Sequence, residues 1–430
     1  MESGVSTHPI RLVVTDDLHR SRLTVFFRLL LAIPHLFWLG LWSIVAFVIV
    51  FISWFATLFK GQSPQGLHDF LAGYLRYGTH IEAYLLLAGN PYPPFFVGSS
   101  TSPYPIDLEI DPPRRQSRWK TGFRLFLALP ALLLAGAFLG GPIASGGFFR
   151  SGLAATAAIL VWFAALARGR TPRGLRDVTA WSIGYGAQVG AYVFLLTDRY
   201  PYTGPGIHLR GLEPPEVDER VPRIANADDG RRSRLTVLLR IPLTFPHLLW
   251  LILWSVVVFF AAIVNWVAAL AICRSPSPLA RFLSAYIRYA THVFAFLYVA
   301  GNPFPGFVGA QGSYPLDPQI DPFERQSRWI TLFRLPLLVP ALLVAGAAGG
   351  VAFVAAVFGW FVSLLRGRMP DGLQTAIAYD LGYSAQLAAY AFLLTDRYPH
   401  SSPQAVFGER RAIQLTLPEP LDSGAPGAFV

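Results

Sequence analysis

Long apolar runs, each preceded by a short polar segment, dominate the pattern of this chain. The first run extends from Leu23 to Phe59 and carries a single charged residue, Arg28. At about 1.5 Å per residue the run would form roughly 55 Å of helix, whereas a bilayer hydrocarbon core is about 30 Å thick. The pattern therefore predicts either a hairpin of two short membrane spans, or an interfacial helix followed by one span after Pro34.

The same pattern occurs four times. Each copy opens with Ser-Arg, and a second arginine follows six residues after the first. The arginine pairs are Arg22 and Arg28, Arg118 and Arg124, Arg234 and Arg240, and Arg328 and Arg334. A proline comes six residues later, a second proline ends the run, and an aromatic-proline pair closes the copy. Self-similarity of this kind indicates a chain built from repeated units.

The copies alternate between two types in the order A-B-A-B. Copies one and three share Arg-Tyr-x-Thr-His, whereas copies two and four share Gly-Tyr-x-x-Gln and Thr-Asp-Arg-Tyr-Pro. We interpret this order as the duplication of a two-unit ancestor, which predicts two halves about a pseudo-twofold axis. The predicted divisions are 8–98 (A), 103–203 (B, with an insert near 140–151), a linker at 204–220, 221–309 (A), 313–400 (B) and a disordered tail at 401–430.

Extra residues in the second copy favour the hairpin. They include the glycine-rich sequence from Gly140 to Gly147, and the fourth copy has a related sequence from Gly346 to Gly350. Because insertions collect in loops, these sequences indicate a turn within the run. Basic residues lie at both ends of the runs, and the positive-inside rule would then place both ends of a hairpin in the cytoplasm.

A Pro-containing turn and a mixed helix follow each run. In the third copy Arg281, Arg288 and His292 fall on one helical stripe, and apolar residues fill much of the rest. Such a helix either lies in the membrane interface or crosses the membrane with its polar stripe facing the bundle; the distribution of basic ends favours the interface. Strand-like alternation at residues 10–14 and 106–110 predicts short strands, one per copy, that pair on the cytoplasmic face.

These elements predict an all-α polytopic membrane protein with four repeated units, each a helical hairpin plus an amphipathic helix, and with short cytoplasmic β-strands. Composition agrees, because 53% of the residues are hydrophobic and 14% are charged, against about 25% charged in soluble domains. The excess of Lys and Arg (35) over Asp and Glu (25) suits anionic head groups. The arginines flank apolar runs instead of clustering in a polar domain, so no nucleic-acid partner is expected.

Several motifs resemble a known family. The sequences His8–Leu12, Ser21–His35 and Tyr92–Phe95 are similar to the bacterial membrane domain of unknown function 4389, and the resemblance extends over nearly the whole chain in four copies. It implies an integral membrane protein of a bacterium. It brings no activity, because the function of that family is not known.

The paired arginines are the first candidate site. The second arginine of each pair, such as Arg28, lies inside an apolar run, where a charge costs about 2.5–3.5 kcal/mol on insertion scales unless it pairs or reaches the interface. It is either a contact for lipid phosphate or another anion, or an interface anchor whose long side chain reaches the head groups. The serine before each first arginine is expected to cap the helix through its hydroxyl.

The Arg-Tyr-x-Thr-His motifs are the second candidate site, an anion site or proton relay that would occur once per half. The residues are Arg76, Tyr77 and His80 in copy one, and Arg288, Tyr289 and His292 in copy three. The alternative is a basic interfacial helix that contacts head groups. Glu82 follows His80, but Phe294 occupies the matching position, so no metal site is expected.

No catalytic or cofactor-binding motif is present in the sequence, so we expect neither an enzyme nor a cofactor. The favoured function is a scaffold or accessory subunit that contacts lipid head groups or partner membrane proteins. The alternative is a small-molecule or ion transporter or channel built on the internal pseudo-twofold. The expected location is the inner (plasma) membrane, with several passes and a cytoplasmic N-terminus; the oligomeric state does not follow from the sequence.

Overall fold

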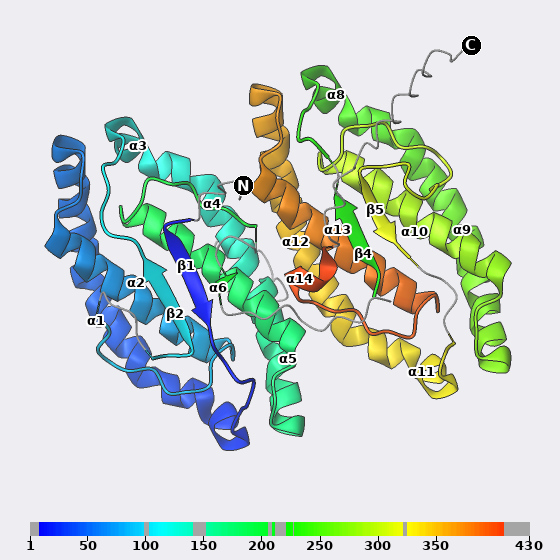
Figure 1. Ribbon diagram of the computed structural model, residues 1–430, viewed down its shortest axis with the longest axis horizontal. Helices are drawn as coiled ribbons and strands as arrows, with labels where there is room; N and C mark the ends of the chain where they lie inside the picture. Colours follow the sequence, from blue (N-terminus) through cyan, green and yellow to red (C-terminus); the bar gives the residue numbers. More distant parts are fainter. Residues whose placement is uncertain are drawn as a thin grey trace, which may run out of the picture.

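The computed structural model describes residues 8–98, 103–140, 152–204, 209–210, 221–226, 228–320 and 325–407. Within these residues the protein has three layers: long apolar helices, shorter buried helices packed on them, and short strands on the opposite side (Figure 1). The strands contact the shorter helices, which therefore form the middle layer.

The apolar runs are continuous helices, so the predicted hairpin is wrong. They form α1 (Arg22–Lys60), α9 (Arg240–Ile272) and α12 (Arg334–Arg366), each with an internal proline. The sequence from Gly346 to Gly350, interpreted as a turn, lies inside α12. Helix α12 as a whole packs on α4 (Arg124–Leu139) and α5 (Leu153–Arg168) of the other half. Packing of the whole helix offsets the low helix propensity of these glycines.

In the second copy the long helix is divided by the insert but keeps its course. Helices α4 and α5 follow one another along the path of a single long helix (Figure 1). Gly140 and Gly152, which flank the insert, are in contact, and the backbone of Gly140 occupies the space that a side chain on Gly152 would need. Residues 141–151 lie outside the described residues. The two described ends of the insert, Gly140 and Gly152, therefore lie side by side.

Each long helix begins at Ser-Arg. In copies two to four the first turns are separate short helices, namely α3 (Arg118–Gly122), α8 (Arg234–Leu238) and α11 (Arg328–Leu332). The serines occupy the N-cap position, but their hydroxyls make no capping hydrogen bond, so the predicted side-chain cap is wrong. The backbone carbonyl acts instead: Ser21 O accepts from Val25 N at 2.9 Å.

The long helices of each half are antiparallel and are joined at both ends by backbone hydrogen bonds. In the first half Gln116 N donates to Gly61 O (2.8 Å) and Arg20 N to Gly169 O (2.9 Å). In the second half Gln326 N donates to Cys273 O (2.7 Å) and Arg232 N to Gly367 O (2.9 Å). All four acceptors are C-cap residues with left-handed φ angles, a position that usually takes glycine. The repeated sequence thus produces repeated contacts.

The middle layer consists of α2 (Gln65–Leu85), α6 (Arg173–Val193), α10 (Ser277–Leu297) and α13 (Asp371–Ala391). Each begins after the second proline of its copy, as predicted, and packs on the long helix that precedes it. Their polar residues are largely buried, including Arg76 and His80 on α2 and His292 on α10. Of the stripe that suggested an interfacial helix, His292 is buried, Arg288 is half-buried and Arg281 is exposed, so protein covers only part of it.

Strands form the outer layer. The predicted strands are confirmed as β1 (Ile10–Val14) and β2 (Ile106–Ile110), which pair antiparallel, with β3 (Leu209–Arg210) parallel to β1. In the other half β4 (Arg223–Asn226) pairs antiparallel with β5 (Leu316–Gln319). The predicted single sheet is therefore wrong. Each half covers its own middle helices with its own strands.

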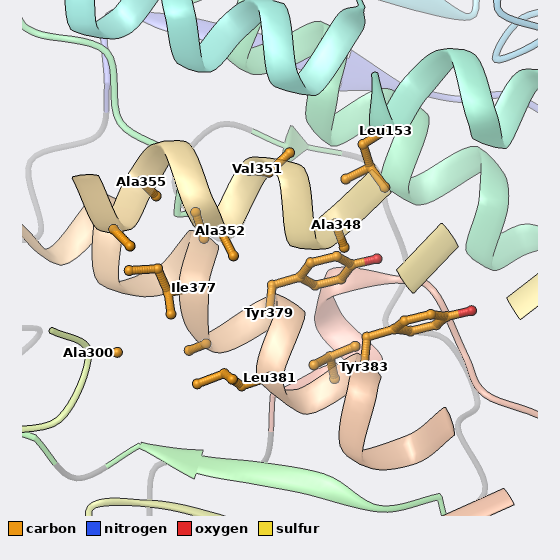
Figure 2. Packing of buried hydrophobic residues seen from close by; sticks show 14 of the residues in the cluster. Leu153, Ala300, Ala348, Val351, Ala352, Ala355, Ile377, Tyr379, Leu381 and Tyr383 are labelled. Atoms are coloured by element: carbon orange, nitrogen blue, oxygen red, sulfur yellow. The ribbon is translucent and has the colours of Figure 1, made fainter. Parts of the chain in front are cut away.

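The two halves meet in a shared apolar core. Alanine and valine side chains of α12 face the tyrosines and isoleucine of α13 (Figure 2), and this cluster continues into α4, α5 and α6 of the other half. The rings of Trp181 and Tyr379 make an edge contact across the junction at 4.9 Å. Residues 403–406, predicted to belong to a disordered tail, form the short helix α14 (Pro403–Val406), which packs on α6 and α13.

Candidate functional site

The second arginine of each pair is buried and binds the end of the middle helix in its own copy. Arg28, Arg124, Arg240 and Arg334 are each at most 2% exposed. In copy one, Arg28 Nη1 donates to Tyr84 O at 2.8 Å and to Gly89 O at 3.1 Å. In copy three, Arg240 Nη1 donates to Phe296 O at 2.7 Å and to Gly301 O at 3.0 Å. The guanidinium thus gives the last-turn carbonyl a second donor, since Tyr84 O also accepts from Leu87 N and Phe296 O from Val299 N, and it ties the following loop to the helix end.

An aromatic ring completes each arginine site. The guanidinium carbon lies 4.1–4.7 Å from the centroid of Tyr84, Tyr192, Phe296 or Tyr390, within the range of a cation–π contact. In the B copies a glutamine from the Arg-Gln-Ser-Arg motif also accepts, since Arg124 Nη2 lies 2.7 Å from Gln116 Oε1 and Arg334 Nη2 lies 2.8 Å from Gln326 Oε1. The expectation of a lipid or anion contact does not describe these four arginines, whose hydrogen bonds are made within the protein.

The first arginines have a different environment at the ends of the long helices. Arg22, Arg118, Arg234 and Arg328 are exposed. Three of them donate to the last turn of the antiparallel neighbour: Arg22 to Ala167 O (3.0 Å), Arg234 to Leu365 O (3.0 Å) and Arg328 to Ala271 O (3.2 Å). Because these four arginines are exposed at helix ends, contact with lipid head groups stays a prediction for them.

The Arg-Tyr-x-Thr-His residues connect the middle layer to the strands. His80 Nε2 lies 2.9 Å from Asp107 Oδ1, and Arg76 Nε lies 3.1 Å from the same oxygen. Arg76 also donates to the carbonyls of Leu108 and Gly98. In copy three His292 Nε2 lies 2.7 Å from Asp317 Oδ1. These aspartates were not singled out in the sequence; the signal available was their place in the strand that follows each A copy.

The tyrosines of the same motifs connect the middle layer to the long helices. Tyr77 Oη lies 2.8 Å from His35 Nδ1, and Tyr289 Oη lies 2.7 Å from His247 Nδ1. Both histidines are buried and come from the Pro-His pairs of the A copies, which were not chosen as site residues. Each A copy therefore contains polar contacts through all three layers. The structure pairs the motif residues with residues outside the motifs: His80 with Asp107 and Tyr77 with His35 in copy one, and His292 with Asp317 in copy three.

The long helices carry their polar residues on the inside. In α1 the buried positions include Arg28, His35, Ser53 and Thr57. Leu29 and Phe47, in contrast, are each 76% exposed. In α9 the buried set includes Arg240, Thr244, His247 and Asn265. Soluble proteins have the reverse arrangement, with apolar side chains buried and charged ones exposed.

The exposed surface of these helices is large. Three described helices, α1, α9 and α12, are long and apolar enough to cross a membrane, and only 11% of the most apolar stretch of α1 is buried. Soluble monomers rarely expose apolar patches larger than a few hundred Å². The composition of this surface is that of a membrane protein.

The described residues contain no group of three or more His, Cys, Asp or Glu side chains placed to hold a metal ion. Comparison with known proteins gives one result. A family model described as domain of unknown function 4389 matches residues 22–97, 147–203, 234–308 and 328–402. The chain belongs to this family. The four DUF4389 matches confirm the four tandem copies, and three of them begin at or next to the first arginine of a pair. No curated protein and no solved structure matches the chain.

Proposed function

We propose that this DUF4389 protein is a non-enzymatic membrane scaffold or accessory subunit, held in the inner (plasma) membrane by its layer of long helices. The inside-out distribution of residues in that layer carries the proposal. Arg28, His35 and Ser53 face the protein, whereas leucine, isoleucine and phenylalanine side chains face outward along the whole of α1. Such an exterior is stable against acyl chains and not against water.

The polar sites support a structural role more than transport. A transporter or channel needs polar groups that are available to a passing solute. Here Arg28 and Arg240 bind helix-end carbonyls, and His80 and His292 bind aspartates of the strand layer. These contacts hold the layers together, which is what a scaffold requires.

Exposed basic residues at the helix ends support contact with anionic head groups. Arg22 and Lys60 lie at opposite ends of α1, and Arg234 and Arg328 lie at corresponding positions in the second half. Since anionic lipid and positive loops are both typical of the cytoplasmic side, we place the N-terminal strand and the strand layer in the cytoplasm.

Two measurements test the proposal. The full chain, expressed in a bacterium, should stay with the membrane after sodium carbonate extraction, and release into the soluble fraction would contradict membrane attachment. Sealed proteoliposomes containing the purified protein should show no selective flux of K⁺, Cl⁻ or amino acids above protein-free vesicles. A selective flux that is abolished by His292→Ala would favour the transporter over the scaffold.

A further inference from the structure

We infer that the long helices lie parallel to the membrane plane within one leaflet, and that the strand layer faces water on the same side as both ends of every helix. This inference rests on the proposed membrane attachment and adds the orientation of the long helices relative to the bilayer. The partner surface is a single leaflet of anionic phospholipid. A multi-pass arrangement, in which the same helices stand across the bilayer, is the alternative that the experiment below separates from it.

The length of the apolar surface is the first observation. On α1 it extends from Leu23, which is 70% exposed, to Phe59, which is 72% exposed. These residues are 36 positions apart, or roughly 54 Å of helix at about 1.5 Å per residue. Even a tilt of about 40° would leave roughly 40 Å along the membrane normal, against a hydrocarbon core of about 30 Å. A helix in the membrane plane keeps this entire surface in contact with acyl chains.

The position of the strand layer is the second observation. About a third of the way along α1, His35 contacts Tyr77 of α2, and one turn further along α2, His80 pairs with Asp107 of β2. The strands therefore lie opposite the body of the long helix, not beyond its end. Figure 1, a view down the shortest axis, shows the strands lying across the helices within the outline of each half.

The outward face of this sheet is charged. Arg11 of β1 pairs with Glu109 at 2.9 Å and with Asp111 at 3.0 Å, and these side chains are 14–26% exposed. If α1 stood across the bilayer, these ion pairs and the sheet edges would lie at the depth of the hydrocarbon core, where unpaired backbone groups and charges are not tolerated facing lipid. With α1 in the membrane plane, the same face lies in water.

The basic residues give the third observation. In the first half they are exposed at both ends of the antiparallel helix pair: Arg22, Arg168 and Arg170 at one end, and Lys60, Arg118 and Lys120 at the other. The second half repeats this arrangement, with Arg231 beside Arg368 and Arg274 beside Arg325. A spanning orientation would place one basic end outside, against the positive-inside rule. In the in-plane orientation all of them border the apolar face at the level of the head groups of one leaflet.

The experiment is cysteine labelling of the full chain in the Cys273→Ser background. Gln65→Cys reports one end of the first helix pair and Asp17→Cys reports the other; both native residues are exposed. Val13→Cys, on the outward side of β1, reports the strand layer. Each variant is labelled with a membrane-impermeant maleimide in inside-out and in right-side-out bacterial membrane vesicles, before and after permeabilisation with detergent.

The in-plane orientation predicts that all three cysteines react fully in inside-out vesicles, with no gain on permeabilisation, and stay unlabelled in right-side-out vesicles. Labelling of Gln65→Cys and Asp17→Cys from opposite sides would overturn the inference and leave membrane attachment intact. Labelling of all three from outside would keep the inference and overturn the cytoplasmic placement. Release of the protein by carbonate is expected if a second copy covers the apolar face. That result would overturn both the in-plane orientation and the proposed membrane attachment.

Discussion

The two outer layers of this molecule expose opposite kinds of residue. The long-helix layer exposes Leu29, Phe47 and similar side chains and buries the second arginine of each pair, whereas the strand layer buries Ile10, Leu12 and Val14 and turns Arg11 outward. Under the proposed membrane attachment, the same chain follows both rules because each layer meets a different solvent. The comparison shows that an arginine in an apolar run is not by itself a surface feature; what counts is the partner that the fold brings to it.

The middle layer joins these two surfaces through polar contacts. Arg28, in the long-helix layer, binds the end of α2, and Asp107, in the strand layer, binds Arg76 and His80 of the same helix. In an environment of low dielectric constant such hydrogen bonds are strong, and a polar group left unpaired is costly. The predictions below place charge on each surface or remove one of these contacts.

The largest effect is expected from charge on the apolar layer. Phe47 and Phe259 are 76% and 62% exposed near the middle of α1 and α9. Replacing each with Asp costs about 3 kcal/mol on insertion scales, so the double variant should partition roughly 10⁴-fold less into membranes. Carbonate extraction measures the loss. The control is Thr15→Asp on the strand side, which should remain fully in the membrane fraction; equal behaviour of the two variants would refute the assignment of the faces.

The buried arginines should contribute more to stability than the exposed ones six residues before them. Arg334→Met leaves the carbonyls of Tyr390 and Thr395 and the carboxylate of Asp396 without this donor. We expect a loss of about 3–5 kcal/mol in the free energy of unfolding. Arg328→Met, which changes an exposed arginine in the same copy, should cost less than about 1 kcal/mol. Thermal unfolding in detergent compares the pair, and similar melting temperatures would count against the helix-end role.

A smaller difference in stability is expected between variants of two aspartates at the first strand pair, the buried Asp107 and the more exposed Asp111. Asp107→Asn removes the charge that Arg76 and His80 share, and should cost about 3 kcal/mol. Asp111→Asn changes a carboxylate that is 22% exposed and pairs with Arg11 and Arg114; its expected cost is at most about 1 kcal/mol. The same unfolding assay applies. A reversed order would mean that the Arg-Tyr-x-Thr-His cluster does not hold the strand layer.

The smallest effect concerns pH. Burial lowers the pKa of His8, next to β1, from 6.5 to about 4. The unfolded chain therefore takes up a proton below pH 6.5 that the folded chain does not bind until pH approaches 4, so stability falls as the pH falls through this window. Between pH 8 and pH 5 the loss from this residue should be about 2 kcal/mol. His8→Asn should remove that part of the pH dependence, and an unchanged pH profile would show that His8 is not its source.

Much of this architecture was predictable because it is local or repeated. The four copies, strands β1 and β2 and the start of each middle helix follow from spacing and alternation, and β1 and β2 have the predicted bounds. The predicted hairpin was wrong because a glycine-rich sequence can form a turn or can lie within a helix. A single sequence does not distinguish the two. Gly346–Gly350 lies inside α12, which packs on α13 of its own half and on α4 and α5 of the other half.

The roles of the site residues were less predictable for the same reason. Arg28 and Arg240 each bind a carbonyl that lies 56 residues further along the chain, and His80 binds an aspartate 27 residues away, in the next copy. The sequence marks these residues as unusual in an apolar context. It does not identify their acceptors, because tertiary packing brings those acceptors to them.

The depth of α1 in the bilayer tests the central claim most directly. Leu23, Leu41 and Phe59 are 18 residues apart and therefore lie on one line along the exposed side of the helix, at 70%, 44% and 72% exposure. A nitroxide spin label is attached at each position in turn, in the Cys273→Ser background, and its depth is measured from collisions with oxygen and with a water-soluble nickel chelate. The in-plane orientation predicts the same depth at all three positions. End labels at the level of the head groups, with the central label near the bilayer midplane, would contradict it.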